Sequence, residues 1–187
     1  ANKTEHKEHL LAVFEILKRN HLFINVGKCQ FGRSSLDFLG HRVDRHGITP
    51  LPAKVEAIQR FPQPKTVKAI MEFNGMINFY HRFIPRASSI LSPLYSAIKG
   101  KTKNAKVEWT SEMDTAFNEA KRALIAATML HHPISGASIS LTVDASAEAV
   151  GAVLQQFTND RWEPLAFFSR QLRAQEKKYS TFDRELL

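Results

Sequence analysis

The feature of this sequence that most constrains its fold is a change in hydrophobic spacing near Gly136. Before it, apolar residues recur every three or four positions, as on one face of a helix, over residues 67–83 and 110–125. After it, apolar and polar residues alternate strictly from 139 to 143, as in a half-buried strand. A helical part followed by a strand-rich part predicts an α+β fold in two parts.

The N-terminal third combines helices with short extended segments. An amphipathic helix is predicted to end near Asn20. Alternation over residues 22–26 predicts a short strand, and residues 36–44 alternate on either side of Gly40. A glycine inside a strand indicates a bulge or a close approach of another group. A second helix is predicted over residues 53–60.

The clearest helix is predicted over residues 67–83. Thr66 can cap its N-terminus, and Pro85 cannot continue it. The positions that fall on its apolar face form the predicted buried stripe, namely Ile70, Phe73, Met76 or Ile77, Tyr80 and Phe83.

A lysine-rich connector at residues 101–106 is the best predicted domain boundary. A shorter helix precedes it at residues 90–98. The helix that follows has Thr110 or Ser111 as its cap and acidic residues in its first turn. Three strand-like segments and a helical tail complete the chain, over residues 139–143, 149–156, 162–169 and 176–187.

The charge balance indicates the class of partner. The chain of 187 residues has 26 Lys and Arg against 18 Asp and Glu, a net charge of +8. Such a surplus favours a polyanion, and nucleic acid is the commonest one, although a merely soluble basic domain is an alternative. No apolar run approaches the ~20 residues that cross a bilayer, so no membrane partner is expected. The single cysteine, Cys29, is typical of a reducing intracellular setting, cytoplasmic or nuclear.

Two acidic residues are the best candidates for chemistry. Asp144 ends a predicted strand and Glu185 lies in a predicted helix, so a sheet and a helix can present both carboxylates to a divalent cation such as Mg²⁺. The spacing alone is a weak signal, because a strand-end Asp more often caps a turn and a helix Glu is more often solvated. Arg82 and Arg86 suit either phosphate contact or a solvated basic face. Zinc-ligand spacing, a Gly-x-Ser-x-Gly elbow and phosphate-loop motifs are absent from the sequence.

An ordered series of sequence blocks then covers nearly the whole chain. LFINVGKCQF and LDFLGHRV, at residues 22–31 and 36–43, resemble the end of the palm in reverse transcriptases of Ty3/gypsy-type retrotransposons. FPQPKTVKAIMEFNGMINFYHRFIPRAS, at residues 61–88, is similar to their thumb. Residues 107–187, with LTVDASAEAVGAVLQQ and EKKYSTFDRELL, resemble the start of the ribonuclease H domain that follows.

The resemblance implies three domains within the α+β class. Residues 1–49 would be the end of the palm with its primer-grip hairpin, and residues 50–105 the helical thumb and connector. Residues 106–187 would hold the opening β-hairpin, third strand and first helix of a ribonuclease H-like α/β domain.

The resemblance also implies which residues contact nucleic acid. The primer grip, a hairpin that holds the 3′ end of the growing strand, falls on residues 38–41. The thumb helix tracks the minor groove in this family, and Met71, Gly75 and Phe79 would face the duplex one turn apart. The full set of residues expected to bind nucleic acid is Lys28, Phe38, Leu39, Gly40, His41, Met71, Gly75, Phe79 and Arg82.

Asp144 and Glu185 match two of the carboxylates with which the family's ribonuclease H holds two Mg²⁺ ions. Polymerisation in the family needs a Tyr-x-Asp-Asp strand, and no Asp-Asp pair occurs in this sequence. Ribonuclease H needs two further acids after Glu185. Asn74 replaces a usually apolar residue. We therefore expect an incomplete catalytic set, with the rest of the polyprotein needed for catalysis.

The expected function is that of a fragment of an RNA-directed DNA polymerase with ribonuclease H activity, which binds an RNA–DNA hybrid or template–primer duplex. The chain has no initiating Met and stops within a helical pattern, which fits a segment of a polyprotein. The alternative is a host-retained, non-catalytic remnant that binds nucleic acid or a protein partner, and a relic without function stays open.

Overall fold

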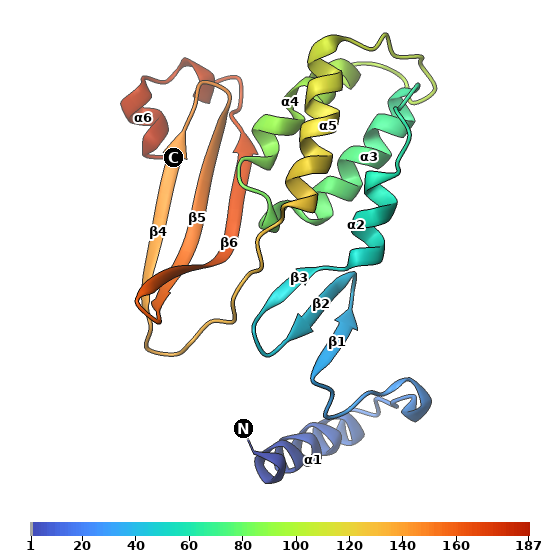
Figure 1. Cartoon of the computed structure of the whole chain (residues 1–187), viewed down its shortest axis with the longest axis vertical. Helices are drawn as coiled ribbons and strands as arrows, with labels where there is room; N and C mark the ends of the chain where they lie inside the picture. Colours follow the sequence, from blue (N-terminus) through green and yellow to red (C-terminus); the bar gives the residue numbers. More distant parts are fainter. Residues whose placement is uncertain (1) are drawn as a thin grey trace. The chain divides into compact units, whose positions relative to one another are not determined.

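The computed structural model describes residues 2–187, which form an α+β fold with two three-stranded antiparallel sheets (Figure 1). The chain divides into two compact units, Ala1–Ser34 and Ser35–Leu187. The α+β class predicted from the spacing change is confirmed.

The first unit consists of helix α1 (Lys3–Arg19) and a 3₁₀ turn, η1 (Val26–Lys28). A capping box starts α1, because the Asn2 side chain accepts from the Glu5 N–H while the Glu5 carboxylate accepts from the Asn2 N–H. The strand predicted over residues 22–26 was wrong. Its alternating pattern is present, but no second strand of this unit pairs with it, and an isolated strand is not stable in water.

The second unit opens with a sheet of strands β1 (Ser35–Phe38), β2 (His41–Asp44) and β3 (Ile48–Pro50). The run whose alternation suggested one strand over residues 36–44 is two strands, and the hairpin that the resemblance implied at residues 38–41 is present. Leu39 and Gly40 form the turn between them, both in the left-handed region, with φ of 45° and 80°. Two left-handed residues match the right-handed twist of a tight hairpin, which is why the chain reverses there.

Four helices build the core of the second unit: α2 (Pro52–Gln59), α3 (Val67–Phe79), α4 (Ala87–Ile98) and α5 (Ser111–Ile125). Thr66 and Thr110 cap α3 and α5, as predicted. α3 ends at Phe79 rather than at residue 83, because the chain tightens into a 3₁₀ turn, η2 (His81–Phe83). The fully buried residues at the centre of this core include Ile70, Phe73, Ile77, Phe83, Leu91 and Leu94.

One buried residue of α3 is polar. Asn74 is 2% exposed, and its amide nitrogen and oxygen have no hydrogen-bond partner among the described residues. Burying an amide without partners costs free energy. Asn74, which the resemblance places at a usually apolar position, is therefore a weak point of the core.

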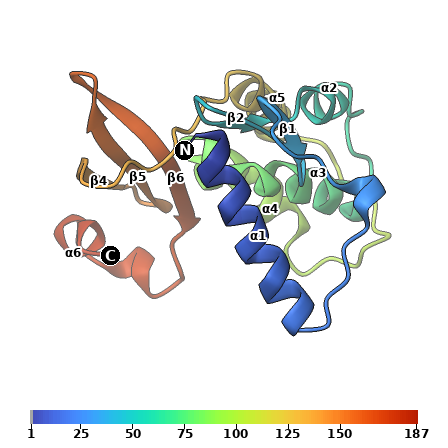
Figure 2. The same ribbon diagram turned by 90° about the horizontal axis from the view of Figure 1, so that it is seen from below.

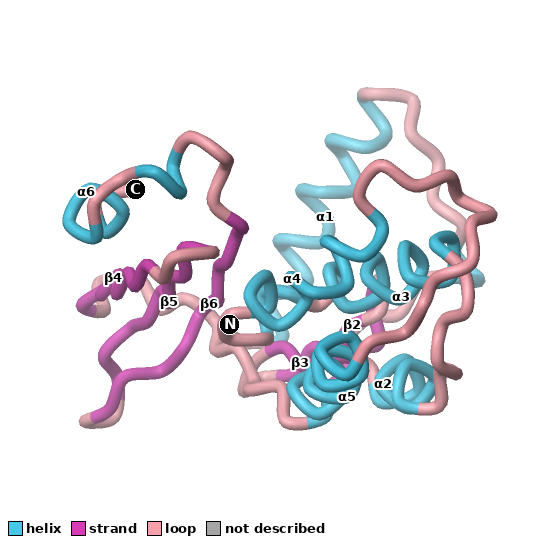
Figure 3. Tube along the Cα trace, turned by 90° about the horizontal axis from the view of Figure 1, so that it is seen from above, coloured by secondary structure: helices cyan, strands magenta, loops and turns pink. Residues whose placement is uncertain are grey.

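The second sheet has the order β4 (Ser138–Ala145), β5 (Ala149–Thr158) and β6 (Arg161–Gln171). It lies beside α4 through β6, as Figures 2 and 3 show from opposite sides. The helical tail predicted over residues 176–187 is interrupted. A 3₁₀ turn, η3 (Glu176–Lys178), is separated from α6 (Thr181–Glu185) because the Ser180 side chain caps a new helix by accepting from the Asp183 N–H.

The first sheet is joined to the second by the segment that precedes β4. Ile48 and Leu130 exchange two backbone hydrogen bonds of 2.8 and 3.0 Å. His132 Nε2 donates to the carbonyl oxygen of Asp44 at 2.6 Å. Gln156 is fully buried, and its amide bonds both the Ile134 N–H and the His132 carbonyl.

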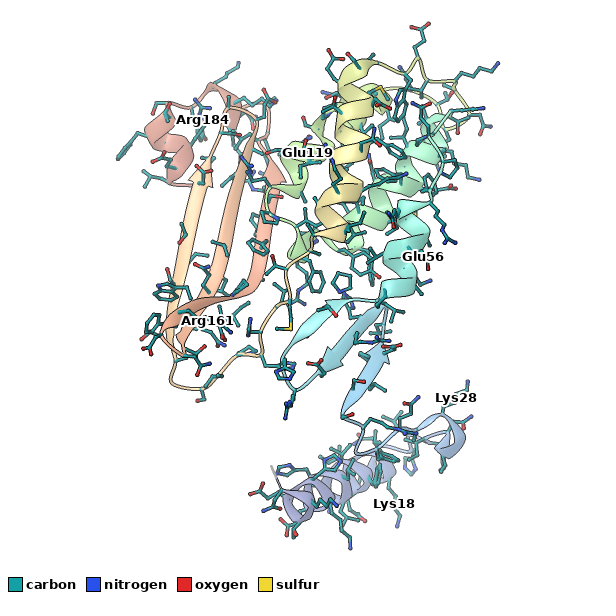
Figure 4. The ribbon with its side chains drawn as sticks, viewed as in Figure 1. Lys18, Lys28, Glu56, Glu119, Arg161 and Arg184 are labelled. Carbon is teal, nitrogen blue, oxygen red and sulfur yellow. The ribbon has the colours of Figure 1, made fainter. Side chains whose placement is uncertain are left out.

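Glu163 is a buried acid at this junction, and it lies at the end of the second sheet that is opposite α6. Figure 4 labels its partner Arg161 at this end of the sheet and Arg184 of α6 at the other end. The Thr158 hydroxyl donates to the carboxylate at 2.7 Å, Arg161 donates at 3.1 Å, and His131 lies 3.0 Å away. The Thr158 hydrogen bond is the largest of the effects that hold the pKa of Glu163 below its usual 4.5, with Arg161 and His131 adding to it against the cost of burial.

The lowered pKa of Glu163 predicts how this junction responds to acid. A carboxyl whose pKa is lower in the folded state contributes stability above its unfolded pKa and loses it as the pH falls through the folded pKa. At pH 7, Glu163→Gln should therefore unfold at a lower urea concentration than the wild type. The difference between the two unfolding midpoints should narrow as the pH falls below 4.5. Urea unfolding over a pH series checks this, and a gap of constant size would contradict it.

Candidate nucleic-acid interface

The β1–β2 turn is fastened to the C-terminal end of α3. The Tyr80 hydroxyl donates to the Gly40 carbonyl at 2.8 Å. Burial raises the pKa of Tyr80, which keeps this donor protonated. A Cβ at Gly40 would lie 3.0 Å from the Phe79 ring, so the close approach predicted for this glycine is present.

His41 points toward the helix rather than away from it. Its imidazole stacks between the rings of Phe79 and Phe83, with ring centroids 5.2 and 5.4 Å away and interplanar angles of 27° and 30°. Its Nε2 is buried without a hydrogen-bond partner among the described residues. In this structure His41 holds the hairpin against α3, while Phe38 and Leu39 are the exposed residues of the turn.

A groove of about 890 Å³ runs between the hairpin turn, α2 and the exposed face of α3. Met71 and Phe79 are 46% and 53% exposed on that face, and Leu39 on the turn is 72% exposed. The surface of the groove is mostly apolar, with one basic side chain, Lys54, and one acidic side chain, Glu72. Its lining residues are Leu39, Gly40, Lys54, Ala57, Ile58, Phe61, Glu72, Gly75, Met76, Phe79 and Tyr80.

Gly75 lies in the middle of α3 on this exposed face. A Cβ built there meets no atom within 4 Å. Glycine in a helix interior costs roughly 0.5–1 kcal/mol relative to alanine. Packing within the described residues gives no reason for glycine at this position.

The structure brings some of the predicted residues together and leaves others apart. Leu39, Gly40, Gly75 and Phe79 line one groove. Four other predicted residues, Phe38, His41, Met71 and Arg82, are near these in the sequence but do not line the groove. Lys28 does not line it either, because it is an exposed residue of η1 in the first unit. The sequence reasoning did not connect α2 with this site, although Lys54, Ala57 and Ile58 form one wall of the groove.

The two predicted carboxylates lie on neighbouring elements. Asp144 is exposed near the end of β4, and Glu185 is the last residue of α6. α6 packs on β4, and the guanidinium of Arg184 donates to the Ser146 carbonyl at 3.1 Å. Two carboxylates suit a hard ion such as Mg²⁺. Residues 2–187 contain no group of three or more His, Cys, Asp or Glu side chains placed to hold a metal ion.

Comparison with known proteins decides the family. The model of a family described as RNase H-like domain found in reverse transcriptase matches residues 109–187. The whole chain is 32% identical to a segment of the Transposon Tf2-3 polyprotein of Schizosaccharomyces pombe, and equally to the Tf2-4 polyprotein. This chain belongs to the reverse transcriptase region of Ty3/gypsy-type retrotransposon polyproteins. The family predicted from the sequence blocks is confirmed.

Solved reverse transcriptases share the fold over nearly the whole chain. The foamy viral protease–reverse transcriptase in complex with an RNA/DNA hybrid is 26% identical, with a TM-score of 0.80 over 99% of this chain. The structure of the same enzyme with double-stranded DNA matches with a TM-score of 0.75 over 96% of this chain. The retrotransposon segment therefore has the fold of the thumb and connection region and the start of the RNase H-like domain.

The match covers only part of each relative. The chain spans 14% of the Tf2 polyproteins, and 25% and 37% of these two foamy viral chains. The predicted domain limits at residues 49 and 105 remain predictions. Within residues 2–187, no helix combines the length and apolar character that crossing a membrane requires.

Proposed function

We propose that this segment holds an RNA–DNA hybrid or template–primer duplex in the groove between the β1–β2 turn and α3, within an RNA-directed DNA polymerase that has ribonuclease H activity. The observation that carries the proposal is Gly75, a helix-interior glycine on an exposed face with open space where a side chain would be. A ligand that approaches the helix backbone accounts for it.

The side chains around Gly75 suit the minor groove of a duplex. Met71 and Phe79 flank the glycine by one turn on either side and expose apolar surface, which packs against sugars and base edges. The net charge of +8 supplies the attraction to phosphates that accounts for much of duplex affinity. Contacts of this kind position a duplex without reading its sequence.

Asp144 and Glu185 are the residues that we assign to a divalent metal. Mg²⁺, when bound, supplies activation of the water that attacks the RNA strand. The strand holds Asp144 in place, and α6 presents Glu185 from the element packed on that strand. In this proposal, the remainder of the polyprotein supplies the further metal ligands of the ribonuclease H site. It also supplies the carboxylates needed for polymerisation.

The test separates stability from binding at one position. Gly75→Ala should raise the free energy of unfolding by about 0.5–1 kcal/mol, because alanine favours helix. The same change should weaken binding to an RNA–DNA hybrid about tenfold, as should Phe79→Ala. Urea unfolding and fluorescence anisotropy measure the two effects.

Ile125→Ala is the matched control, because Ile125 is an apolar residue of α5 that is 51% exposed, close to the 53% of Phe79. It should leave hybrid affinity unchanged. Wild-type affinity in the Gly75→Ala variant would refute the proposed groove.

A further inference from the structure

A pocket of about 330 Å³ lies in the second unit, where two hairpin turns meet the segment that precedes β4. One turn joins β2 to β3, and the other joins β5 to β6. The pocket shares no lining residue with the groove on α3, and it contains neither Asp144 nor Glu185. Its lining residues are Arg45, His46, Met129, His131, His132, Ile134, Gln156, Asn159, Arg161 and Glu163.

The one acid that lines this pocket is already bound by the protein. The Glu163 carboxylate accepts from the Thr158 hydroxyl and from Arg161, and His131 Nδ1 lies 3.0 Å from it. The Gln156 amide is also occupied, because its oxygen and its nitrogen each bond a backbone group. The side chains that remain for a ligand are therefore mainly basic ones, so the pocket suits an anion rather than a cation.

Arg45 supplies the free cation of the pocket. Its Nε donates to His46 Nε2 at 3.0 Å, and its two terminal amino groups have no hydrogen-bond or ion-pair partner among residues 2–187. The adjacent acid, Asp44, does not line the pocket, and its carboxylate accepts from the His46 and Gly47 N–H groups. Arg45 thus keeps a planar pair of donors for a ligand, which is the geometry that binds two oxygens of an oxyanion.

Arg161 reaches the same pocket from the β5–β6 turn, and Figure 4 labels it at this end of the sheet. Its Nε and Nη2 each lie 3.1 Å from Glu163 Oε1, which leaves Nη1 for another acceptor. Asn159 of the same turn also lines the pocket and has an amide that can donate. Two guanidinium groups from two different hairpins therefore line a pocket whose carboxylate is paired.

The size of the pocket and its charges indicate the class of ligand. Sites for small ligands measure roughly 300–1,000 Å³, so this pocket is near the lower end of that range. A phosphoryl group carries several negatively charged oxygens and can engage both guanidinium groups at once, whereas a single carboxylate is satisfied by one. The pocket therefore fits a small phosphate-containing anion better than a carboxylate.

From this geometry we propose that the pocket between the β2–β3 and β5–β6 turns binds a phosphoryl group, with Arg45 and Arg161 as its charged contacts. The group has two sources, a free anion such as pyrophosphate or the terminal phosphate of a nucleic-acid strand. The proposal is independent of the proposed function, because neither arginine lines the groove on α3.

Calorimetric titration of the chain with pyrophosphate at constant ionic strength tests this pocket. Arg45→Ala should weaken pyrophosphate binding about tenfold, through loss of charge-assisted hydrogen bonds. Arg45→Lys keeps the charge but not the planar fork, so it should restore only part of the affinity. Arg161→Ala should also weaken binding. Arg122→Ala removes an exposed arginine of α5 outside the pocket and is the matched control, with unchanged affinity expected.

Two oligonucleotides distinguish the sources of the phosphoryl group. They are short single strands of one sequence, with and without a 5′ phosphate, and each is used to compete with pyrophosphate. If the ligand is the end of a strand, only the phosphorylated strand competes, and the competition is lost in Arg45→Ala. If the ligand is a free anion, neither strand competes, and binding of pyrophosphate still depends on Arg45.

No binding of pyrophosphate to the wild type, or a loss in Arg45→Ala no larger than in Arg122→Ala, would overturn the proposal. Thermal unfolding without ligand should give the same melting temperature for Arg45→Ala and the wild type, since the Arg45 side chain bonds only the neighbouring His46. Gly75→Ala should bind pyrophosphate as the wild type does, so a failure of the groove on α3 leaves this result intact.

Discussion

Phe73→Ala should lower the free energy of unfolding by about 3–5 kcal/mol, because it removes a fully buried ring from the centre of the helical core. The Phe73 ring lies 4.5 Å from that of Phe117 in α5 and 5.8 Å from that of Phe61 after α2, measured between centroids. It therefore joins three elements, and close packing on all sides leaves little room for collapse into the cavity.

Urea unfolding of the wild type and the variant measures this loss. Phe79→Ala is the matched control, since the same substitution on the opposite face of the same helix removes a ring that is 53% exposed. We expect it to cost far less stability and to affect hybrid binding instead. Equal destabilisation by the two substitutions would show that the two faces of α3 do not divide packing from binding.

The division between these two faces was predictable from the sequence, because it depends on helical spacing alone. The stripe Ile70, Phe73, Ile77, Tyr80 and Phe83 is buried as predicted. Met71, Gly75 and Phe79 are exposed, also as the spacing requires. Most helices and all three strands of the second sheet were also predictable, because they depend on local periodicity and capping residues.

Two of the errors have a common physical cause, which is dependence on partners far along the chain. Residues 22–26 alternate like a strand but find no strand to pair with in their unit. Residues 36–44 turn back at Leu39 and Gly40, where Tyr80 holds the turn from 40 residues away. The interruption of the tail has a local cause instead, since the Ser180 side chain caps α6 by accepting from the Asp183 N–H.

The candidate site shows the same limit. The sequence indicated Gly40 from its position within a strand pattern and Gly75 through the resemblance, but nothing local shows that they line one groove. His41 was predicted to contact nucleic acid, and in the structure its ring stacks between Phe79 and Phe83.

Gly47→Ala should lower the free energy of unfolding by roughly 2–5 kcal/mol, from overpacking and the loss of two backbone hydrogen bonds. A Cβ at buried Gly47 would lie 2.2 Å from the Leu130 carbonyl oxygen. That oxygen cannot move away freely, since it accepts from the Ile48 N–H at 2.8 Å while Leu130 donates to the Ile48 carbonyl at 3.0 Å. Relief of the clash must therefore break the bridge that joins the first sheet to the segment before β4.

Hydrogen exchange at the Ile48 and Leu130 amides, together with urea unfolding, checks this prediction. Both amides should lose protection in Gly47→Ala, whereas Gly75→Ala, which adds the same methyl group in open space, should leave them protected and raise stability. Unchanged protection and stability in Gly47→Ala would show that the backbone accommodates the methyl group without opening the bridge. The two glycines thus separate a position that packing explains from one that packing leaves unexplained.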